Sequence, residues 1–226
     1  MSETVQLPDS LSFRIPPSWD DVPIEAEAFK VWHDESVRSA EEVGLPRSQI
    51  RQFELLMART RQELLEGRAI AAATLVQPVS SDEEDAEPEL LLAAVSLTVQ
   101  TREELGAPVP LRTDYLLQAM TNGQTEENDD VADLEPPKIV DLPAGEGLRL
   151  IRLRTESDPS TGQMARVFSQ SYLVPLADGE AVAILGFLTP TIRQARPMAE
   201  VFSAMARSLV AYYPGDDTTT GIQPSG

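Results

Sequence analysis

The last third of the chain alternates short apolar segments with turns, and this pattern constrains the fold more than any other feature. Four segments of five to ten residues have strand-like composition: 138–142, 148–155, 165–174 and 181–188. Gly, Pro and Asp, which favour β-turns, separate them. One of these turns contains Asp178-Gly179, a dipeptide typical of tight hairpins. The pattern therefore predicts four consecutive antiparallel strands.

The preceding part of the chain adds helices and three further strands. Alternation at 11–15 and apolar runs at 69–76 and 90–99 favour strands, the last two paired with each other. Apolar spacing predicts helices at 46–66 and 111–120. We expect 20–42 to be a loop with at most one short helix.

A final amphipathic helix is predicted because apolar residues recur at helical spacing: Met198, Val201, Phe202, Met205, Leu209 and Tyr212. Together these elements predict an α+β fold, an antiparallel β-sheet with helices packed on its faces. No repeat or linker divides the chain. We therefore expect a single domain at 11–213, between a flexible N-terminus at 1–10 and a disordered tail at 214–226.

The charge of the chain excludes several classes of partner. Its 226 residues include 37 acidic and 18 basic side chains, a net charge of −19. A negative surface repels nucleic acid phosphates and anionic lipid head groups. We expect a protein partner with a basic surface, no nucleic acid and no membrane insertion, since no apolar run approaches the ~20 residues of a membrane helix. The start of the chain lacks the features of a signal peptide, which predicts a cytoplasmic protein.

Catalytic chemistry finds little support in the residue types. The chain has no cysteine, which excludes thiolate metal sites and a cysteine nucleophile, and His33 is its single histidine. A catalytic or metal-binding His33 would need Asp34 or Glu35 to converge on it, but adjacent residues point in different directions. We favour a surface or half-buried histidine. Phosphate-binding glycine loops and hydrolase motifs are absent. We predict no enzyme activity, no cofactor and no metal.

Two acidic segments, 80–89 and 126–135, hold twelve acidic residues and no basic one. They lack the spacing of a calcium-binding loop, and their mutual repulsion favours solvated loops. Concentrated charge of this kind also favours electrostatic docking of a basic partner. The predicted docking acids are Asp82, Glu83, Glu84, Asp85, Glu87, Glu126, Glu127, Asp129 and Asp130.

Tyr212 and Tyr213 are further candidates for partner binding. They stand at the end of the predicted final helix, and tyrosine tolerates half-burial at an interface. The apolar face of that helix is expected to pack on the sheet instead.

Several motifs resemble the PsbP-like superfamily, which includes the photosystem protein PsbP, a Ran-binding import factor and LpqN-like lipoproteins. FRIPPSW at 13–19 resembles its opening strand and tryptophan. Two later blocks resemble uncharacterised actinobacterial members: VDLPAGEGLRLIRL at 140–153 and SQSYLVPLADGEAVAILGFLTPT at 169–191. The resemblance covers about 11–213. It implies an α+β fold and a binding or assembly role without enzymatic activity.

The leading hypothesis is a non-enzymatic protein-binding module, an adaptor or accessory protein of a secretion or envelope-linked system, that docks through its acidic loops. One alternative is an immunity protein that neutralises a basic toxin. The other is a small-ligand carrier or enzyme with a cavity between sheet and helices. The first two predict association that weakens with salt, whereas the third predicts thermal stabilisation by a small molecule.

Overall fold

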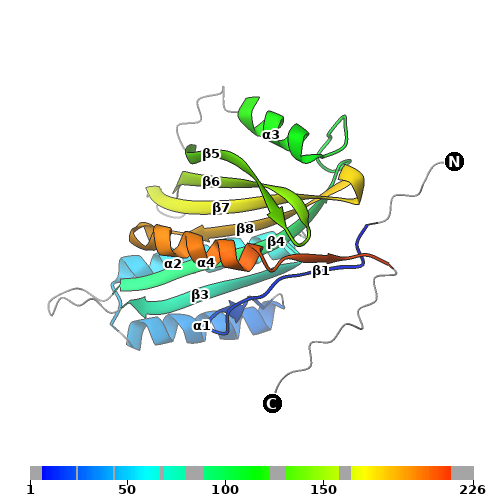
Figure 1. The fold of residues 1–226 in the computed structure, drawn as a ribbon. Coiled ribbons are helices and arrows are strands. Elements are labelled where there is room, and N and C mark those ends of the chain that lie inside the picture. Colours follow the sequence, from blue (N-terminus) through cyan, green and yellow to red (C-terminus); the bar gives the residue numbers. More distant parts are fainter. Residues whose placement is uncertain are drawn as a thin grey trace, which may run out of the picture.

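A computed structural model describes residues 7–23, 25–42, 44–66, 69–79, 89–122, 131–157 and 164–214. Within them, seven antiparallel strands form a sheet in the order β2-β3-β4-β8-β7-β6-β5 (Figure 1). The strands of this sheet are β2 Asp20–Asp21, β3 Ala71–Val79, β4 Glu89–Thr101, β5 Val131–Leu142, β6 Gly145–Ser157, β7 Met164–Leu176 and β8 Ala181–Thr189. A separate pair joins β1 Ser10–Ser12 to β9 Val210–Tyr212. The predicted α+β fold is confirmed.

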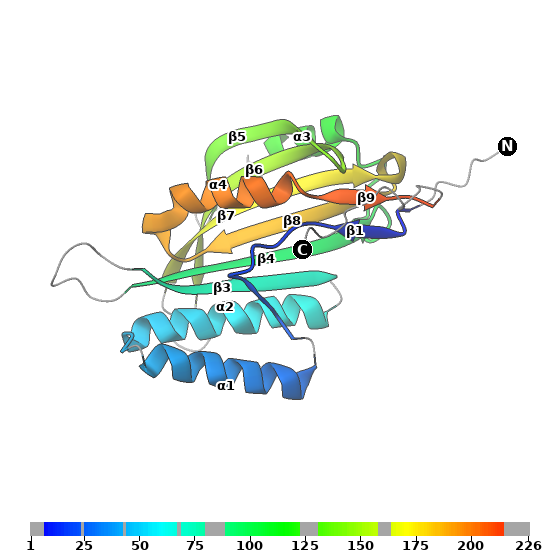
Figure 2. The same ribbon diagram turned by 60° about the horizontal axis from the view of Figure 1, so that its bottom comes forward.

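Helices cover both faces of the sheet. They are α1 Ala26–Glu42, α2 Arg47–Leu65, α3 Thr113–Asn122 and α4 Ala195–Ala206. Successive residues of a strand point to opposite faces, so β4 contributes to two cores. Its Val95 packs in the core under Phe202 of α4, whereas Ala94 packs in the core under Phe53 of α2. Figure 2 shows α1 and α2 along the β3 side of the sheet, with α4 over its middle.

The third helix shares its face of the sheet with α2 but lies over the other half. Leu116 of α3 packs with Leu148 and Leu150 of β6. The apolar faces of these helices are therefore buried against the sheet, as the amphipathic patterns predict.

The strand predictions for the last third are confirmed. Strands β5 to β8 are consecutive neighbours, each pair antiparallel. The turn between β7 and β8 is the short helix η2, Ala177–Gly179. The predicted pairing of the two earlier apolar runs is also confirmed, as β3 with β4.

Two regions that the sequence predicts as loops contain regular secondary structure. The segment 20–42 contains the 17-residue helix α1, not a loop with one short helix. Phe29, Trp32, Val37 and Ala40 provide its packing stripe against α2 and the sheet. Strand β5 begins at Val131, so the last part of the predicted loop 126–135 belongs to the sheet.

The predicted end of the final helix was also wrong. Helix α4 ends at Ala206, and 210–212 form β9. The hydroxyl of Ser208 donates to the Met205 carbonyl at 2.6 Å and accepts the Arg14 N–H at 2.7 Å. Ser208 thus provides a hydrogen-bond donor for a carbonyl at the end of α4. It also holds the N-terminal segment at Arg14 beside the end of this helix. Leu209 stays buried in the core without being helical.

No helix in the described part of the chain combines the length and apolar character needed to cross a bilayer.

Candidate binding sites at the two ends of the sheet

The two acidic segments join the sheet at the same end. The chain leaves β3 at Val79 and re-enters β4 at Glu89, which pair with each other. It re-enters the sheet again at Val131 of β5, opposite Arg154 near the end of β6. This end lies at the left of Figure 1. The nine predicted docking acids, at 82–87 and 126–130, lie outside the described residues.

Two acids of the second predicted loop are held in ion pairs within the sheet. Asp133 Oδ1 accepts from Nε of Arg152 at 2.7 Å, and Glu135 Oε2 accepts from a guanidinium nitrogen of Arg149 at 2.6 Å. The two pairs tie the edge strand β5 to β6. Because their charge is compensated, these two acids add little to an electrostatic docking surface.

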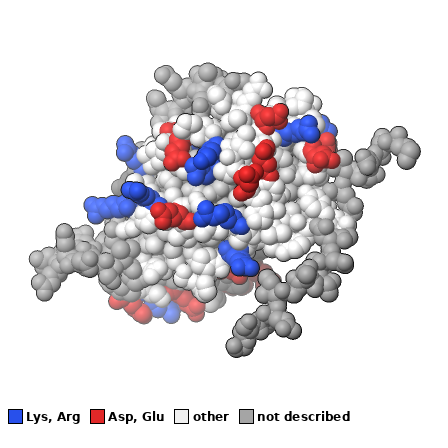
Figure 3. All heavy atoms as spheres, in the orientation of Figure 1, with Lys and Arg blue, Asp and Glu red and all other residues white. Residues whose placement is uncertain are grey.

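Charges of both signs mix on the face that α4 covers. Figure 3 shows acidic and basic side chains interspersed over this face, with no continuous patch of one sign. An electrostatic docking surface needs an excess of one sign, so this face does not supply it.

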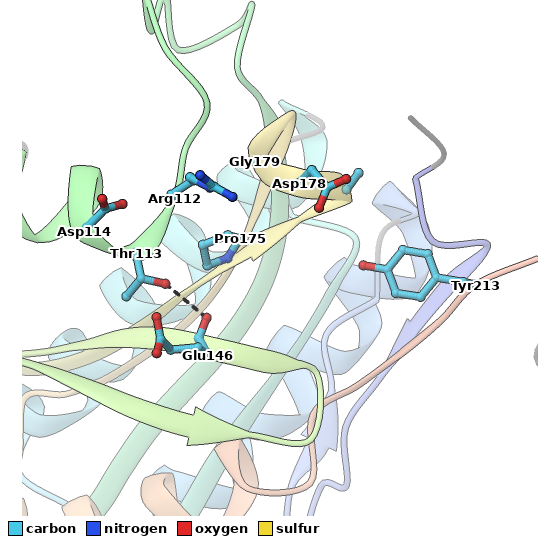
Figure 4. A pocket seen from close by; sticks show the side chains of 9 residues that line it. Arg112, Thr113, Asp114, Glu146, Pro175, Asp178, Gly179 and Tyr213 are labelled. Carbon is cyan, nitrogen blue, oxygen red and sulfur yellow. Dashed lines mark hydrogen bonds between the residues drawn. The ribbon is translucent and has the colours of Figure 1, made fainter. Parts of the chain in front are cut away.

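The opposite end of the sheet holds a cavity of about 510 Å³ (Figure 4). Its lining comes from the start of α3, the β5–β6 hairpin, the end of β7, η2 and the segment after β9: Arg112, Thr113, Asp114, Glu146, Pro175, Ala177, Asp178, Gly179 and Tyr213. Sequence analysis missed this site because its polar side chains come from separate elements and form no local motif.

Tight backbone contacts build the wall of this cavity. Ala177, Asp178 and Gly179 all have positive φ, and Gly179 at +90° packs against the segment before α3. The Leu111 N–H donates to the Gly179 carbonyl at 2.8 Å. A Cβ on Gly179 would lie 2.7 Å from the Leu111 nitrogen, so only glycine fits there.

The charges around this cavity are mostly negative. Asp114, Glu146 and Asp178 contribute three carboxylates against the one guanidinium of Arg112. All four side chains are exposed, and none forms an ion pair with a described residue. The lining therefore favours a group that carries positive charge.

The two tyrosines lie at this end, away from the acidic segments. Tyr213 lines the cavity, and its hydroxyl points toward it in Figure 4. Tyr212 belongs to β9, is half-buried and pairs with Ser10. The 13 residues of β4 span about 40 Å between the two ends. The two tyrosines therefore lie at the other end of the sheet from Val79, Glu89 and Val131, the described residues next to the acidic segments.

His33 is half-buried on α1, as predicted. Its Nδ1 lies 3.4 Å from Asp34 Oδ1, and its ring packs against Phe29 with centroids 5.9 Å apart. Among the described residues, no three His, Asp or Glu side chains gather in a way that would hold a metal.

Comparison with known proteins gives a likeness in structure but none in sequence. No protein family matches the chain, and no curated protein matches it in sequence. The chain is similar in structure to LpqN of Mycobacterium tuberculosis, a protein described as involved in cell envelope biogenesis. The TM-score is 0.46 at 9% identity, over 90% of this chain and 83% of LpqN. A likeness at this level carries no inference about function.

Proposed function

We propose that this protein is a non-enzymatic cytoplasmic binding module that docks a protein with a basic surface. Docking takes place at the end of the sheet that adjoins 80–88 and 123–130, the stretches of the chain that contain the nine predicted docking acids. The observation that carries this proposal is the shared end, fixed by the pairing of Val79 with Glu89 and of Val131 with Arg154. Two segments that supply nine acids are thus joined to the sheet at one end.

The spacing of the segments favours a protein over a small molecule. Four strand spacings separate β4 from β5, a distance of ~19 Å. The strand ends that adjoin the two segments are thus too far apart for one small ligand to contact both, whereas a standard protein interface of about 800 Å² per partner spans them. Charge-matched docking of this kind raises the association rate and weakens with salt.

The proposed role is that of an adaptor or accessory protein in an envelope-linked or secretion system. Membership of the PsbP-like superfamily is part of the same proposal. The support for membership is the motif order, in which the tryptophan of FRIPPSW is a core residue. Trp19 is 7% exposed and packs edge-on against Phe202 with centroids 6.4 Å apart. An immunity protein for a basic toxin would use the same surface, and the identity of the captured partner distinguishes the two.

Two triple variants with equal charge change test the docking end. The first neutralises the acidic end with Glu126→Gln, Glu127→Gln and Asp129→Asn. The control neutralises the far cavity with Asp114→Asn, Glu146→Gln and Asp178→Asn. Tagged wild type captures a partner from host lysate at low and high salt, and mass spectrometry identifies it. We expect retention to fall with salt and in the first variant alone; equal loss in both variants would refute docking at the acidic end.

The cavity at the far end supports a second candidate function, a carrier of a small cationic molecule. Its volume of about 510 Å³ lies in the range of small-molecule sites, and its lining has three carboxylates against one guanidinium. Spermidine serves as a probe. The carrier function predicts that spermidine raises the melting temperature of the wild type but not of the far-cavity variant. Equal shifts in both proteins would indicate non-specific binding and contradict it.

A further inference from the structure

A second cavity, of about 220 Å³, lies between α1 and the β3 side of the sheet. Its apolar walls are Trp32 and Ala40 of α1, Leu45 after α1, Val76 of β3 and Leu90 of β4. Asp20 of β2 is exposed and adds one carboxylate to the lining, beside two serines of α1. The cavity thus combines an apolar interior with one negative charge.

Aromatic packing positions the Trp32 side chain at this cavity. Its ring contacts Phe29 with centroids 5.6 Å apart, which holds the indole in place. Phe29 in turn carries the guanidinium of Arg61 4.7 Å from its ring centroid. Neither the indole N–H of Trp32 nor the carboxylate of Asp20 has a hydrogen-bond or ion-pair partner among the described residues. Within the described part of the chain, both groups can therefore contact a ligand.

The cavity adjoins the proposed docking end. Leu90 directly follows Glu89, the residue at which the chain re-enters the sheet after 80–88, and Val76 pairs with Leu92 beside it. Strand β2 pairs only with Ala73 and Thr74, so the part of β3 from Leu75 onward has a described partner on one side only.

The other edge of the sheet is less accessible to an extended chain. Strand β5 contains Pro136 and Pro137, which lack N–H donors, and its register with β6 shifts on both sides of Glu135. The outer stretch of β3 also contains a proline, Pro78, so the cavity, and not strand pairing, distinguishes this edge.

We infer that this cavity receives the side chain of a lysine or arginine from the basic partner. The inference rests on the proposed function and names the contact that anchors it. Long basic side chains combine an aliphatic stem with a charged head, which matches apolar walls with one carboxylate. The face of a tryptophan attracts such a head through its quadrupole. A partly buried tryptophan is also the residue type most often found at interface hot spots.

The experiment uses the two tryptophans of the chain as separate reporters. A ¹H–¹⁵N spectrum shows one indole N–H signal each for Trp19 and Trp32, assigned with Trp32→Phe. Capped Gly-rich pentapeptides with a central Arg, Lys or norleucine are titrated to tens of millimolar. We expect the Arg and Lys peptides to shift the Trp32 signal alone, with an affinity several-fold above that of the norleucine peptide. No shift at Trp32, or equal affinity for norleucine, would overturn the inference.

Matched variants test the contribution of the carboxylate. Asp20→Asn removes the charge at the cavity, and Glu200→Gln removes the same charge from an exposed position of α4, on the other face of the sheet. We expect the first to weaken Arg and Lys peptide binding several-fold and the second to leave it unchanged. Equal effects of the two variants would mean that the peptides respond only to the net charge of the protein, which would contradict a specific site at this cavity.

The outcomes separate this inference from the proposed function, because the peptide titration needs no partner protein. If the peptides shift Trp32 while the acidic-end triple variant binds the partner normally, the docking proposal fails and the cavity stands. If the triple variant loses the partner while no peptide shifts Trp32, the cavity inference fails alone.

Discussion

The hydroxyl of Thr191 donates a hydrogen bond to the carbonyl oxygen of Leu90, 3.1 Å away, and accepts the N–H of Leu92 at the same distance. These are backbone groups of β4 that lie beyond the end of β8. Pro190 interrupts β8 and has no N–H to offer. Side-chain hydroxyls of the FLTPT block therefore continue the hydrogen bonding between β8 and β4 past the end of β8. The hydroxyl of Thr189 adds a hydrogen bond to the Leu92 carbonyl. This relationship gives a structural role to one of the motifs that the sequence singles out.

Replacing Thr191 by valine is predicted to destabilise the protein. The substitution keeps the shape but leaves a buried N–H and carbonyl of β4 without partners, at a cost of about 1–3 kcal/mol. Urea unfolding measures the free energy. Thr121→Val, at an exposed hydroxyl that bonds only within α3, is the matched control and should change stability by less than about 0.5 kcal/mol. A Thr191→Ser variant that fails to recover most of the loss would contradict the role of the hydroxyl.

Gly179→Ala is predicted to destabilise more than Gly44→Ala. Both glycines have positive φ, +90° and +78°, so both alanines carry backbone strain of about 1–2 kcal/mol. Only at Gly179 would the new Cβ collide, at 2.7 Å from the Leu111 nitrogen, whereas Gly44 has open space. The collision adds about 1–3 kcal/mol. Equal unfolding free energies for the two variants would mean that the turn does not hold the segment before α3.

The two ion pairs of β5 are predicted to differ in strength. Asp133 and Arg152 are 21% and 19% exposed, whereas Glu135 is 55% exposed beside Arg149. Water screens the second pair more, so its coupling should fall below about 1 kcal/mol. We expect about 1–2 kcal/mol for Asp133 with Arg152. Double-mutant cycles with amide replacements measure both couplings, and the reverse order would contradict the prediction.

Glu104 is predicted to make stability depend on acid pH. Its carboxylate accepts the Thr101 N–H at 2.7 Å and the Thr101 hydroxyl at 2.8 Å. The backbone bond first, and the hydroxyl second, lower the pKa of Glu104 below its usual 4.5. Hydrogen bonds to the charged form therefore contribute stability above the unfolded pKa, and this contribution is lost as pH falls through the lower folded pKa. The melting temperature gap between wild type and Glu104→Gln should shrink from pH 7 to pH 3; a constant gap would show that ionisation is not involved.

Much of the fold follows from local patterns in the sequence. Turn dipeptides and alternation located β5 to β8, because a hairpin needs only neighbouring residues to form its register. Helix α1 was missed because its apolar stripe is narrow and flanked by charged residues. The stripe consists of Phe29, Trp32, Val37 and Ala40, and it is recognisable only once the folded chain packs it against α2. Leu209 and Tyr212 continued the helical spacing of α4 by coincidence. Tyr212 instead pairs with Ser10 of β1, about 200 residues away in the chain, and Leu209 lies between α4 and β9.

The candidate sites depend even more on tertiary structure. Charge density singled out the acidic segments, since like charges adjacent in sequence need no fold to be recognised. The shared end of those segments, the cavity around Arg112 and the cavity at Trp32 each join elements distant in sequence. No periodicity or motif encodes such meetings. Tyr213 was predicted to bind a partner, and this stays a prediction; in the structure it lines the far cavity.

The central claim is that a basic partner docks at the acidic end of the sheet. Its most direct test is the association rate constant of the captured partner, measured by stopped flow at low and physiological ionic strength. The proteins compared are the wild type, the acidic-end triple variant and the far-cavity triple variant. We predict that the acidic-end variant associates several-fold more slowly than the other two at low salt, and that the difference narrows as salt screens the charges. Equal rates for the two triple variants at both salt concentrations would contradict the account.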